Sequence, residues 1–526
     1  MSSPFSPSFL KGEARAEQFL PGAFRQGATR LRWLQERRER RPAAGVLKAL
    51  EDQARLRPGG EAVKKNLAAL AEPGTLAVVT GQQVALFLGP LYSFYKAASA
   101  IAAARELERE TGIRCVPVFW LQTEDHDYDE IQRCQVLSAE GTILNLSLPD
   151  DVGCDQVRTS VRHRRLDASI ELQLEQLTTQ LGALPHADVF LNLLRAHYRP
   201  GVSLADAFAG VMGSLFGAEG LLLLDPRDAA LAAIAAPVHA RALMGALEIS
   251  DILRVREQAL KAAGFDVQVH VRPGSPLFFY HPDGAEGPRY RLDPAGSQWT
   301  LAGSERTVSS AELQRDLARD PLRFSTSALL RPILQDYLLP VAAYVAGPGE
   351  INYLAQTSPL SQWMKVPPAM VIPRARFRLL EPRTRSLLEM LHLTPSDVEC
   401  PREELHPSSH SEVEQRLMGN VRSSLDALEK EAAQLHLSDA LATTRATMER
   451  AASRFAGRYQ RRLAEKDRVS SERLDRLRMH LYPEGMPQER FHSLPYFACK
   501  YGVDTLKSLI FSKLTPFSGE LENLSL

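Results

Sequence analysis

The sequence predicts an α/β protein that combines a parallel-sheet core with a long helical hairpin near its C-terminus. Two short apolar runs, residues 76–79 and 115–121, have the length and β-branched content of buried strands. They flank an alanine-rich helix that ends near Gly112, and strand, helix and strand in this order indicate a βαβ unit. Apolar residues spaced three and four apart between residues 411 and 481 predict two long amphipathic helices with a break at 437–439.

Length and composition restrict the possible classes of protein. A chain of 526 residues exceeds one ordinary hydrophobic core, so we expect two or three domains. The 63 basic residues balance 63 acidic residues, and no overall field therefore favours nucleic acid or a membrane surface. No apolar run approaches the roughly twenty residues of a membrane span, and the first twenty residues carry no apolar signal core. The cysteines are scattered without a CxxC motif, which favours a reducing cytoplasm: Cys115, Cys134, Cys154, Cys400 and Cys499.

The remaining elements follow from periodicity and turn residues. Residues 1–75 are predicted to be helical, with the arginine-rich stretch 30–41 as a solvated helix face. Further strands are predicted at 142–148, 220–225, 341–345 and 369–372, helices at 168–217 and from 226 to about 263, and small antiparallel strands at 267–271, 277–281 and 289–292. The expected segments are an N-terminal helical segment (1–75), the first half of the core (76–150), a helical insertion (151–219), further core (220–265), a small β insertion (266–305), the second half of the core (306–400), the coiled-coil hairpin (408–482) and a C-terminal segment returning to the core (483–526).

Polar side chains follow both strands of the βαβ unit. Ligands bind outside the carboxyl ends of strands in such sheets, and the helix beginning near Gly89 would present its N-terminus there. We therefore expect the active site to include Thr80, Gly81, Gln82 and Gln83 after the first strand, and Glu124, Asp125, His126 and Asp127 after the second.

The second group suggests acid–base chemistry. Its carboxylates could hold an ammonium group, coordinate Mg²⁺ or deprotonate an amine, and clustering is expected to raise their pKa values. His126 could act near neutral pH. A polar cap on a strand end is the simpler alternative. The His126-Asp127 doublet also occurs in metal-dependent phosphohydrolases, but the further histidine ligands of that class are not evident, and no metal ligands are assigned.

Other candidates would bind anions or a nucleotide. Gln82 and Gln83 could hydrogen-bond a carboxylate or sugar hydroxyls, and Tyr92 and Lys96 share one helix face. Arg331 and Arg374 are candidate anion clamps. Gly347, Gly349 and Glu350 at a helix start could hold a phosphate or ribose, and Tyr501 or Tyr496 could stack on adenine, although ordinary turns and aromatic packing would explain these residues equally well. No Walker A motif is present.

Several of these motifs occur together in one order: Thr80-Gly81-Gln82-Gln83, Gly89-Pro90-Leu91-Tyr92, Pro117-Val118-Phe119-Trp120 leading to Glu124-Asp125-His126-Asp127, Gly347-Pro348-Gly349-Glu350, and Tyr501-Gly502. In this order and spacing the chain resembles the cysteine ligases of bacillithiol biosynthesis, the BshC family. The resemblance extends over nearly the whole chain and includes the helical hairpin.

The resemblance implies a cytoplasmic enzyme that joins L-cysteine to glucosaminyl-malate through an amide bond. It also implies a Rossmann-like core with connecting-peptide insertions, and a coiled coil that makes a homodimer. The core is similar to class I aminoacyl-tRNA synthetases, which activate carboxylates with ATP. Here Gly89-Pro90-Leu91-Tyr92 stands at the HxGH position, and Arg323-Phe324-Ser325-Thr326-Ser327 only loosely resembles the KMSKS loop. ATP or ADP is therefore a possible cofactor, and a need for Mg²⁺ is left open.

Two alternatives remain open at this point. One is another nucleotide-dependent ligase or nucleotidyltransferase on the same core, which substrate tests would separate. The other is a non-catalytic coiled-coil scaffold on a degenerate nucleotide-binding domain, which would show no turnover. For the ligase the expected partners are its small-molecule substrates, cysteine and glucosaminyl-malate, and a second copy of the chain, with no nucleic acid and no membrane.

Overall fold

The computed structural model describes residues 3–150, 159–400, 412–466 and 468–526. The chain divides into two compact units. Unit 1 comprises residues 1–139, 144–377 and 492–522, and unit 2 comprises residues 140–143, 378–491 and 523–526. Cys154 and residues 408–411 of the expected hairpin lie outside the described residues.

The described residues of unit 1 contain a parallel sheet of five strands in the order β12-β11-β1-β2-β5. The strands are β1 (Leu76–Gln83), β2 (Cys115–Gln122), β5 (Leu222–Leu224), β11 (Val341–Ala346) and β12 (Met370–Pro373). All five predicted core strands are thus confirmed. Their apolar side chains are almost completely buried, as both faces of a parallel sheet require.

The order of the strands creates a switch point beside β1. The chain passes from β1 to β2 and β5 on one side, and then returns to add β11 and β12 on the other side. Connections therefore leave the carboxyl ends of β1 and β11 in opposite directions, which opens a crevice where ligands commonly bind.

Strand β1 is longer than predicted. Thr80 to Gln83 continue the strand instead of forming a turn, because β2 is equally long and pairs with β1 up to Gln83 opposite Gln122. Helix α6 (Tyr92–Thr111) then returns the chain to β2 and ends at Gly112, whose φ of 68° is readily adopted by glycine. The predicted βαβ unit is confirmed.

The N-terminal segment is helical, as predicted, and its arginine-rich stretch is only partly solvated, with Arg32, Arg38 and Arg41 exposed. Arg30 pairs with Glu110 on α6 (2.6 Å), Arg37 donates to the Pro368 carbonyl (3.0 Å), and both are buried. The prediction of a solvated face is therefore wrong for these two arginines, and Arg30 points inward because helix α3 packs on α6. The helices are α1 (Phe5–Lys11), α2 (Ala14–Glu17), α3 (Gly27–Gln35), α4 (Val46–Arg55) and α5 (Gly60–Ala71).

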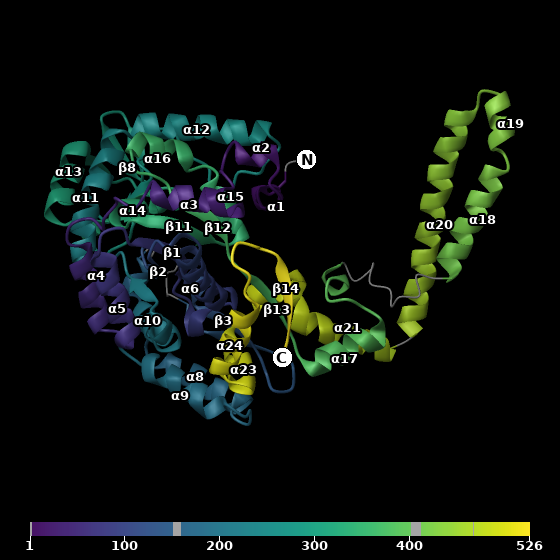
Figure 1. Ribbon diagram of the computed structural model, residues 1–526, viewed down its shortest axis with the longest axis horizontal. Helices are drawn as coiled ribbons and strands as arrows, with labels where there is room; N and C mark the ends of the chain where they lie inside the picture. The colour runs from purple at the N-terminus through teal and green to yellow at the C-terminus, as the bar shows by residue number, and fades with distance from the viewer. Residues whose placement is uncertain (1–2, 151–158, 401–411, 467) are drawn as a thin grey trace. The chain divides into compact units, whose positions relative to one another are not determined.

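Between β2 and β5 the chain forms a short sheet and a group of helices (Figure 1). The predicted strand at 142–148 is present but pairs with a neighbouring strand in a separate two-stranded sheet. The elements are α7 (Tyr128–Ile131), β3 (Arg133–Leu137), β4 (Ile143–Ser147), α8 (Ser169–Leu181), α9 (Ala187–His197) and α10 (Leu204–Phe216).

After β5, helices α11 (Ala229–Met244) and α12 (Ala246–Ala262) lead to an antiparallel sheet in the order β10-β6-β7-β8-β9. The predicted strand at 267–271 is wrong. The Val269 carbonyl there accepts a hydrogen bond from the Gln356 side chain, so this backbone is satisfied without a strand partner. The strands are β6 (Phe278–Tyr280), β7 (Tyr290–Ala295), β8 (Gln298–Leu301), β9 (Thr307–Ser309) and β10 (Phe324–Thr326).

The later helices of unit 1 are α13 (Ser310–Arg319), α14 (Arg331–Leu338), α15 (Pro348–Leu354), α16 (Ser358–Met364), α23 (Leu494–Tyr501) and α24 (Val503–Lys513). Helix α22 (Gln488–Phe491) belongs to unit 2. No single helix among the described residues is long and apolar enough to cross a membrane. The pair α11 and α12 meets that requirement only together and is bent by 78° at its break.

Unit 2 contains the predicted helical hairpin. Figure 1 shows α18 (Glu412–Asp426) beside α20 (Ser438–Lys466), and Arg422 pairs with Glu449 between them (2.9 Å). The predicted break is confirmed between α19 (Glu429–Gln434) and α20. Helices α17 (Pro382–Leu391) and α21 (Arg468–Leu481) pack through a small leucine core, and β13 (Arg376–Leu380) pairs with β14 (Leu521–Ser525).

Candidate functional site

A buried lysine occupies the crevice between β1 and β11. The Lys96 ammonium on α6 donates to the Gly81 carbonyl (2.6 Å) and to Gln82 Oε1 (2.9 Å) at the end of β1. It also pairs with Glu350 Oε2 of α15 (2.6 Å), and Lys96 is only 3% exposed. We name the group around it the switch-point cluster: Gln82, Tyr92, Lys96, Arg331, Tyr344, Glu350, Tyr353 and Arg374.

Glu350 is the carboxylate at the centre of this cluster. Besides Lys96, it accepts hydrogen bonds from the Tyr344 hydroxyl (2.6 Å) and the Gly347 N–H (2.8 Å). Burial by itself raises the pKa of Glu350, but the Lys96 charge and these hydrogen bonds outweigh burial and hold the pKa below its usual value. Glu350 is therefore ionised, and it already accepts the hydrogen bond of the Gly347 N–H, which directly precedes α15.

Arg331 and Arg374 add positive charge to the cluster. Arg331 donates to the Tyr353 hydroxyl (3.2 Å), and its guanidinium lies 4.9 Å from the centre of the Tyr344 ring. The Arg374 guanidinium lies 5.6 Å from the Tyr92 ring centre. Lys96, Arg331 and Arg374 are each more than nine-tenths buried, and Glu350 pairs with Lys96. A group of buried cations at the carboxyl edge of the sheet is suited to an oxyanion ligand.

The loop of residues 124–127, at the carboxyl end of β2, is held by one arginine. Arg289, next to β7, donates through its guanidinium to the Glu124 carbonyl, to Asp125 Oδ1 (2.9 Å) and to His126 Nδ1 (2.8 Å). The Glu124 carboxylate is itself buried and accepts from the Thr326 N–H (2.9 Å) and hydroxyl on β10. The antiparallel sheet therefore fixes the shape of this loop.

The prediction that clustering raises the pKa of these acids is wrong for Asp125. Burial does raise its pKa, but hydrogen bonding from His126 and the Arg289 charge, together with Gln83, hold the pKa well below the usual range. Asp125 is therefore a stable anion and a poor proton acceptor near neutral pH.

The two neighbours of Asp125 differ in what they offer to a ligand. A guanidinium can only donate, so His126 Nδ1 accepts from Arg289, and a neutral ring then carries its proton on Nε2. His126 thus presents an N–H donor from a side chain that is 32% exposed. Asp127 is exposed and directly precedes helix α7.

Strand β1 joins the two groups. Gln82 contacts Lys96 and donates to the Tyr92 hydroxyl (3.3 Å), whereas Gln83 donates to Asp125 Oδ2 (3.1 Å). Successive side chains on a strand point to opposite faces, so the last two residues of β1 reach different partners. The end of β1 therefore connects the switch-point cluster with the 124–127 loop.

Most of the candidates predicted from the sequence are brought together here, but some are not. The Thr80 hydroxyl bonds the Val345 carbonyl (2.9 Å) inside the sheet, and an added Cβ on Gly349 would meet no atom within 4 Å. Tyr501 ends α23, which packs on α9, and Lys500 lies over its ring. The segment 323–327, compared above with the KMSKS loop, contains strand β10 of the antiparallel sheet.

Sequence reasoning missed Arg289, Tyr344 and Tyr353. These residues lie in ordinary strands, helices and turns, and no local motif distinguishes them. Their importance comes from partners far away in the chain, such as the 164 residues that separate Arg289 from Asp125. In the described part of the chain, no group of three or more His, Cys, Asp or Glu residues is arranged to hold a metal ion.

Comparison with known proteins finds a protein family whose two domains both match this chain. Residues 2–375 match the family described as "Bacillithiol biosynthesis BshC, N-terminal Rossmann-like domain", and residues 377–524 match its "C-terminal coiled-coil domain". The chain is 34% identical to "Putative cysteine ligase BshC" of Koribacter versatilis over 94% of this chain and 88% of the relative. A protein of the same name from Salinibacter ruber is 33% identical, over 85% of this chain and 83% of the relative.

Proposed function

Because the chain belongs to the BshC family of bacillithiol biosynthesis, we propose that it is a ligase that joins L-cysteine to glucosaminyl-malate through an amide bond. The observation that best supports this role is the switch-point cluster, where three buried cations surround one ionised carboxylate at the carboxyl edge of the sheet. Both reactants carry carboxylates, and such a site can bind and orient them.

The proposal gives each group a limited task. Lys96, Arg331 and Arg374 bind a carboxylate of the acidic acceptor or of cysteine, while Glu350 keeps Lys96 charged and in place. Amide formation also requires a positioned amine that loses its proton. In this proposal His126, through Nε2–H, and the exposed Asp127 orient the amine, and Asp125 holds that loop in shape.

Activation of the carboxylate by ATP or ADP, with or without Mg²⁺, is also part of the proposal. A phosphate, like a carboxylate, suits the cationic cluster, but the Gly347 N–H expected to bind it is already bonded to Glu350. When bound, the nucleotide would turn a carboxylate oxygen into a leaving group. A core related to class I aminoacyl-tRNA synthetases and a cytoplasmic location complete this part of the proposal.

The proposal also includes a homodimer formed through the hairpin. Large apolar side chains on α20 are exposed, among them Met448 (41%), Phe455 (56%) and Tyr459 (42%). They are spaced seven and four residues apart and so share one helix face, which is suited to a second copy of the hairpin.

The test is formation of the amide by purified protein. Cysteine and glucosaminyl-malate are incubated with and without ATP and Mg²⁺, and the product and any AMP or ADP are measured by mass spectrometry. We expect a new amide, and release of AMP or ADP would identify the mode of activation. Absence of the amide under every condition would contradict this function and favour another ligase activity or a scaffold.

Variants of the 124–127 loop test the assigned roles in the same assay. His126→Ala should lower the rate about a hundredfold by misplacing the amine. Glu130→Gln is the matched control, because Glu130 is exposed in the same loop region and should leave the rate unchanged. Equal rates for the two variants, with folding confirmed by circular dichroism, would remove His126 from the site.

A further inference from the structure

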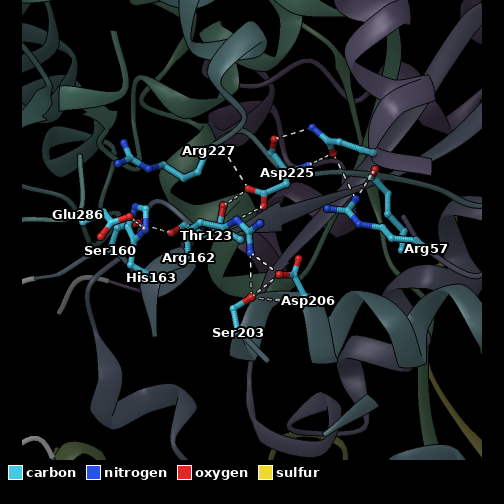
Figure 2. A network of polar contacts seen from close by, with 12 residues as sticks. Arg57, Thr123, Ser160, Arg162, His163, Ser203, Asp206, Asp225, Arg227 and Glu286 are labelled. Carbon is cyan, nitrogen blue, oxygen red and sulfur yellow. Dashed lines mark hydrogen bonds and ion pairs between the residues drawn. The ribbon is translucent and has the colours of Figure 1, made fainter. Parts of the chain in front are cut away.

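A polar cavity of about 700 Å³ lies at the carboxyl end of β5, within unit 1. Its walls come from the end of α4, the loop after β5, residues 161–165 and the start of α10 (Figure 2). Five arginines line it, namely Arg57, Arg162, Arg165, Arg199 and Arg227. We name it the β5 cavity. It shares no lining residue with the switch-point cluster or with the 124–127 loop.

One arginine neutralises the two central carboxylates of this cavity. Arg162 contacts Asp225 through Nε (3.0 Å) and Asp206 through Nη1 (2.8 Å), and Figure 2 shows it between them. Asp225 also accepts from the Thr123 hydroxyl and the Arg227 N–H, and Asp206 from the Ser203 hydroxyl. These two carboxylates are therefore already well paired.

Two other arginines, the buried Arg227 and the partly buried Arg57, form no ion pair with a described carboxylate. Arg57 donates to the Leu223 carbonyl (2.9 Å), and Arg227 donates to the carbonyls of Leu322 (2.6 Å) and Ala285 (2.8 Å). Neither forms an ion pair with any described residue. Arg227 is only 6% exposed, and its Nε has no hydrogen-bond partner there. Buried charge that is not paired is costly, and a bound anion would relieve this cost.

The rim adds two further arginines and a histidine. Arg165 donates to the Gly201 carbonyl (2.8 Å), and the exposed Arg199 side chain forms no hydrogen bond with any described residue. His163 Nε2 is buried without a hydrogen-bond partner among the described residues. Burial and the nearby Arg227 charge lower the pKa of His163, so its ring is neutral at neutral pH and can bond a hydroxyl group.

The remaining carboxylates of the cavity do not cancel this charge. Asp228 caps α11 by accepting from the N–H groups of Ala230 (2.9 Å) and Leu231 (3.1 Å). The Glu286 side chain is 87% exposed at the mouth, 3.9 Å from His163 Nδ1. None of the described lining residues is Phe, Tyr or Trp.

We propose that the β5 cavity binds a small oxyanion, a carboxylate or a phosphate, on a molecule that also carries a hydroxyl group. Arg57, Arg227 and Arg199 bind the oxyanion, and His163 bonds the hydroxyl. This site goes beyond the proposed ligase function, since it uses none of the residues to which that function was assigned.

Two matched probes test the site and separate its possible ligands. L-Malate carries a hydroxyl group and carboxylates, and glycerol 3-phosphate carries hydroxyl groups and a phosphate. Each is titrated into the full-length protein by calorimetry, with neutral glycerol as the control ligand. We expect saturable binding of at least one anion and none of glycerol, and the tighter anion identifies the chemical class.

Two variants with the same change of charge locate the binding. Arg199→Glu should weaken binding of the anion about tenfold or more, because it replaces a charged donor by a repelling carboxylate. Arg315→Glu on α13 is the control, because Arg315 is exposed and does not line the cavity. Its effect should stay within about twofold.

Protection from an arginine-specific reagent gives a readout that does not depend on a variant. Modification by phenylglyoxal is mapped by mass spectrometry, and the bound anion should protect Arg165 and Arg199 but leave Arg315 reactive. Failure of both anions to bind at millimolar concentration would overturn the proposal. Binding without protection of Arg165 and Arg199 would also overturn it, because the anion would then occupy another site.

Discussion

Arg289 is the residue through which the antiparallel sheet controls the 124–127 loop. Its guanidinium contacts three consecutive residues of that loop and lies 4.1 Å from the Phe279 ring centre. It is 5% exposed, so its charge depends on Asp125 for compensation. A single side chain of this kind can couple the shape of a candidate site to the stability of the fold.

We predict that Arg289→Met lowers the free energy of unfolding by about 3 kcal/mol, because it leaves the Asp125 carboxylate, whose side chain is only 25% exposed, without its cation. Arg306→Met is the matched control. Arg306 pairs with Asp283 at 2.9 Å, but both side chains are about half exposed, so the loss should not exceed about 1 kcal/mol. Urea denaturation measures both values, and equal losses would contradict the role given to Arg289.

Gly81 and Gly349 should differ in how much stability the protein loses when each is replaced by alanine. An added Cβ on Gly81 would lie 3.0 Å from the Trp120 carbonyl oxygen in the neighbouring strand, whereas on Gly349 it would meet nothing within 4 Å. We expect Gly81→Ala to cost about 1–3 kcal/mol of stability, since backbone atoms must move. Gly349→Ala in α15 should be neutral or stabilising by up to about 1 kcal/mol. Thermal and urea unfolding measure the stability of both variants. A larger loss of stability for Gly349→Ala than for Gly81→Ala would contradict this expectation.

At the scale of elements, α11 connects the end of β5 with the antiparallel sheet. Asp228 caps its N-terminus beside the β5 cavity, and further along the helix His239 packs against Phe278 and Phe324. Burial lowers the pKa of His239 to about 4. The His239 ring therefore stays neutral in the folded protein near pH 6.5, where an exposed histidine begins to bind a proton.

This difference predicts acid sensitivity. Between pH 6.5 and about 4 the unfolded chain binds a proton at His239 that the folded chain excludes, so stability falls as the pH is lowered through this range. The slope is about 1.4 kcal/mol per pH unit for this one proton. His239→Leu should remove that part of the slope in urea unfolding at pH 7, 6 and 5.

Two comparisons keep this test specific. His281, whose pKa is lowered to about 3 by burial, contributes a similar slope that should persist in the variant. His436→Asn at the exposed hairpin turn, where φ is 56°, should leave the pH dependence unchanged. An undiminished slope in His239→Leu would contradict the assignment.

At the scale of the whole molecule, the hairpin of unit 2 exposes several large apolar side chains. Leu428, Leu435 and Leu437 are between 48% and 68% exposed near its turn. Met448, Phe455 and Tyr459 on α20 are exposed as well. A hairpin with such surface is suited to a partner hairpin.

We expect the protein to be a dimer in solution and Phe455→Glu to shift it toward the monomer, because a charge would be buried in the interface. Thr443→Glu is the control, since residue 443 is exposed on a different face of α20. Light scattering coupled to size-exclusion chromatography measures the mass of each variant. A monomeric wild-type protein, or an equal effect of both substitutions, would contradict the proposed dimer.

The sequence by itself determined the elements and the edge of the sheet where the candidate site lies. The runs at 76–79 and 115–121, the glycine at 112 and the helical spacing of the hairpin are local patterns, and each follows from the periodicity of one strand or helix. Polar residues after both strands had to meet at one edge, because parallel strands place their carboxyl ends together.

Only the tertiary structure decided which charges meet. Glu350 pairs with Lys96, Arg289 holds Asp125, and Arg227 enters the β5 cavity, and in each case the partners come from distant segments. The pKa of Asp125 moves in the direction opposite to that expected from clustering, because hydrogen bonding from His126 and the charge of the distant residue Arg289 both lower it. Electrostatic environments depend on burial and on distances in space, and neither quantity is contained in a local pattern of residues.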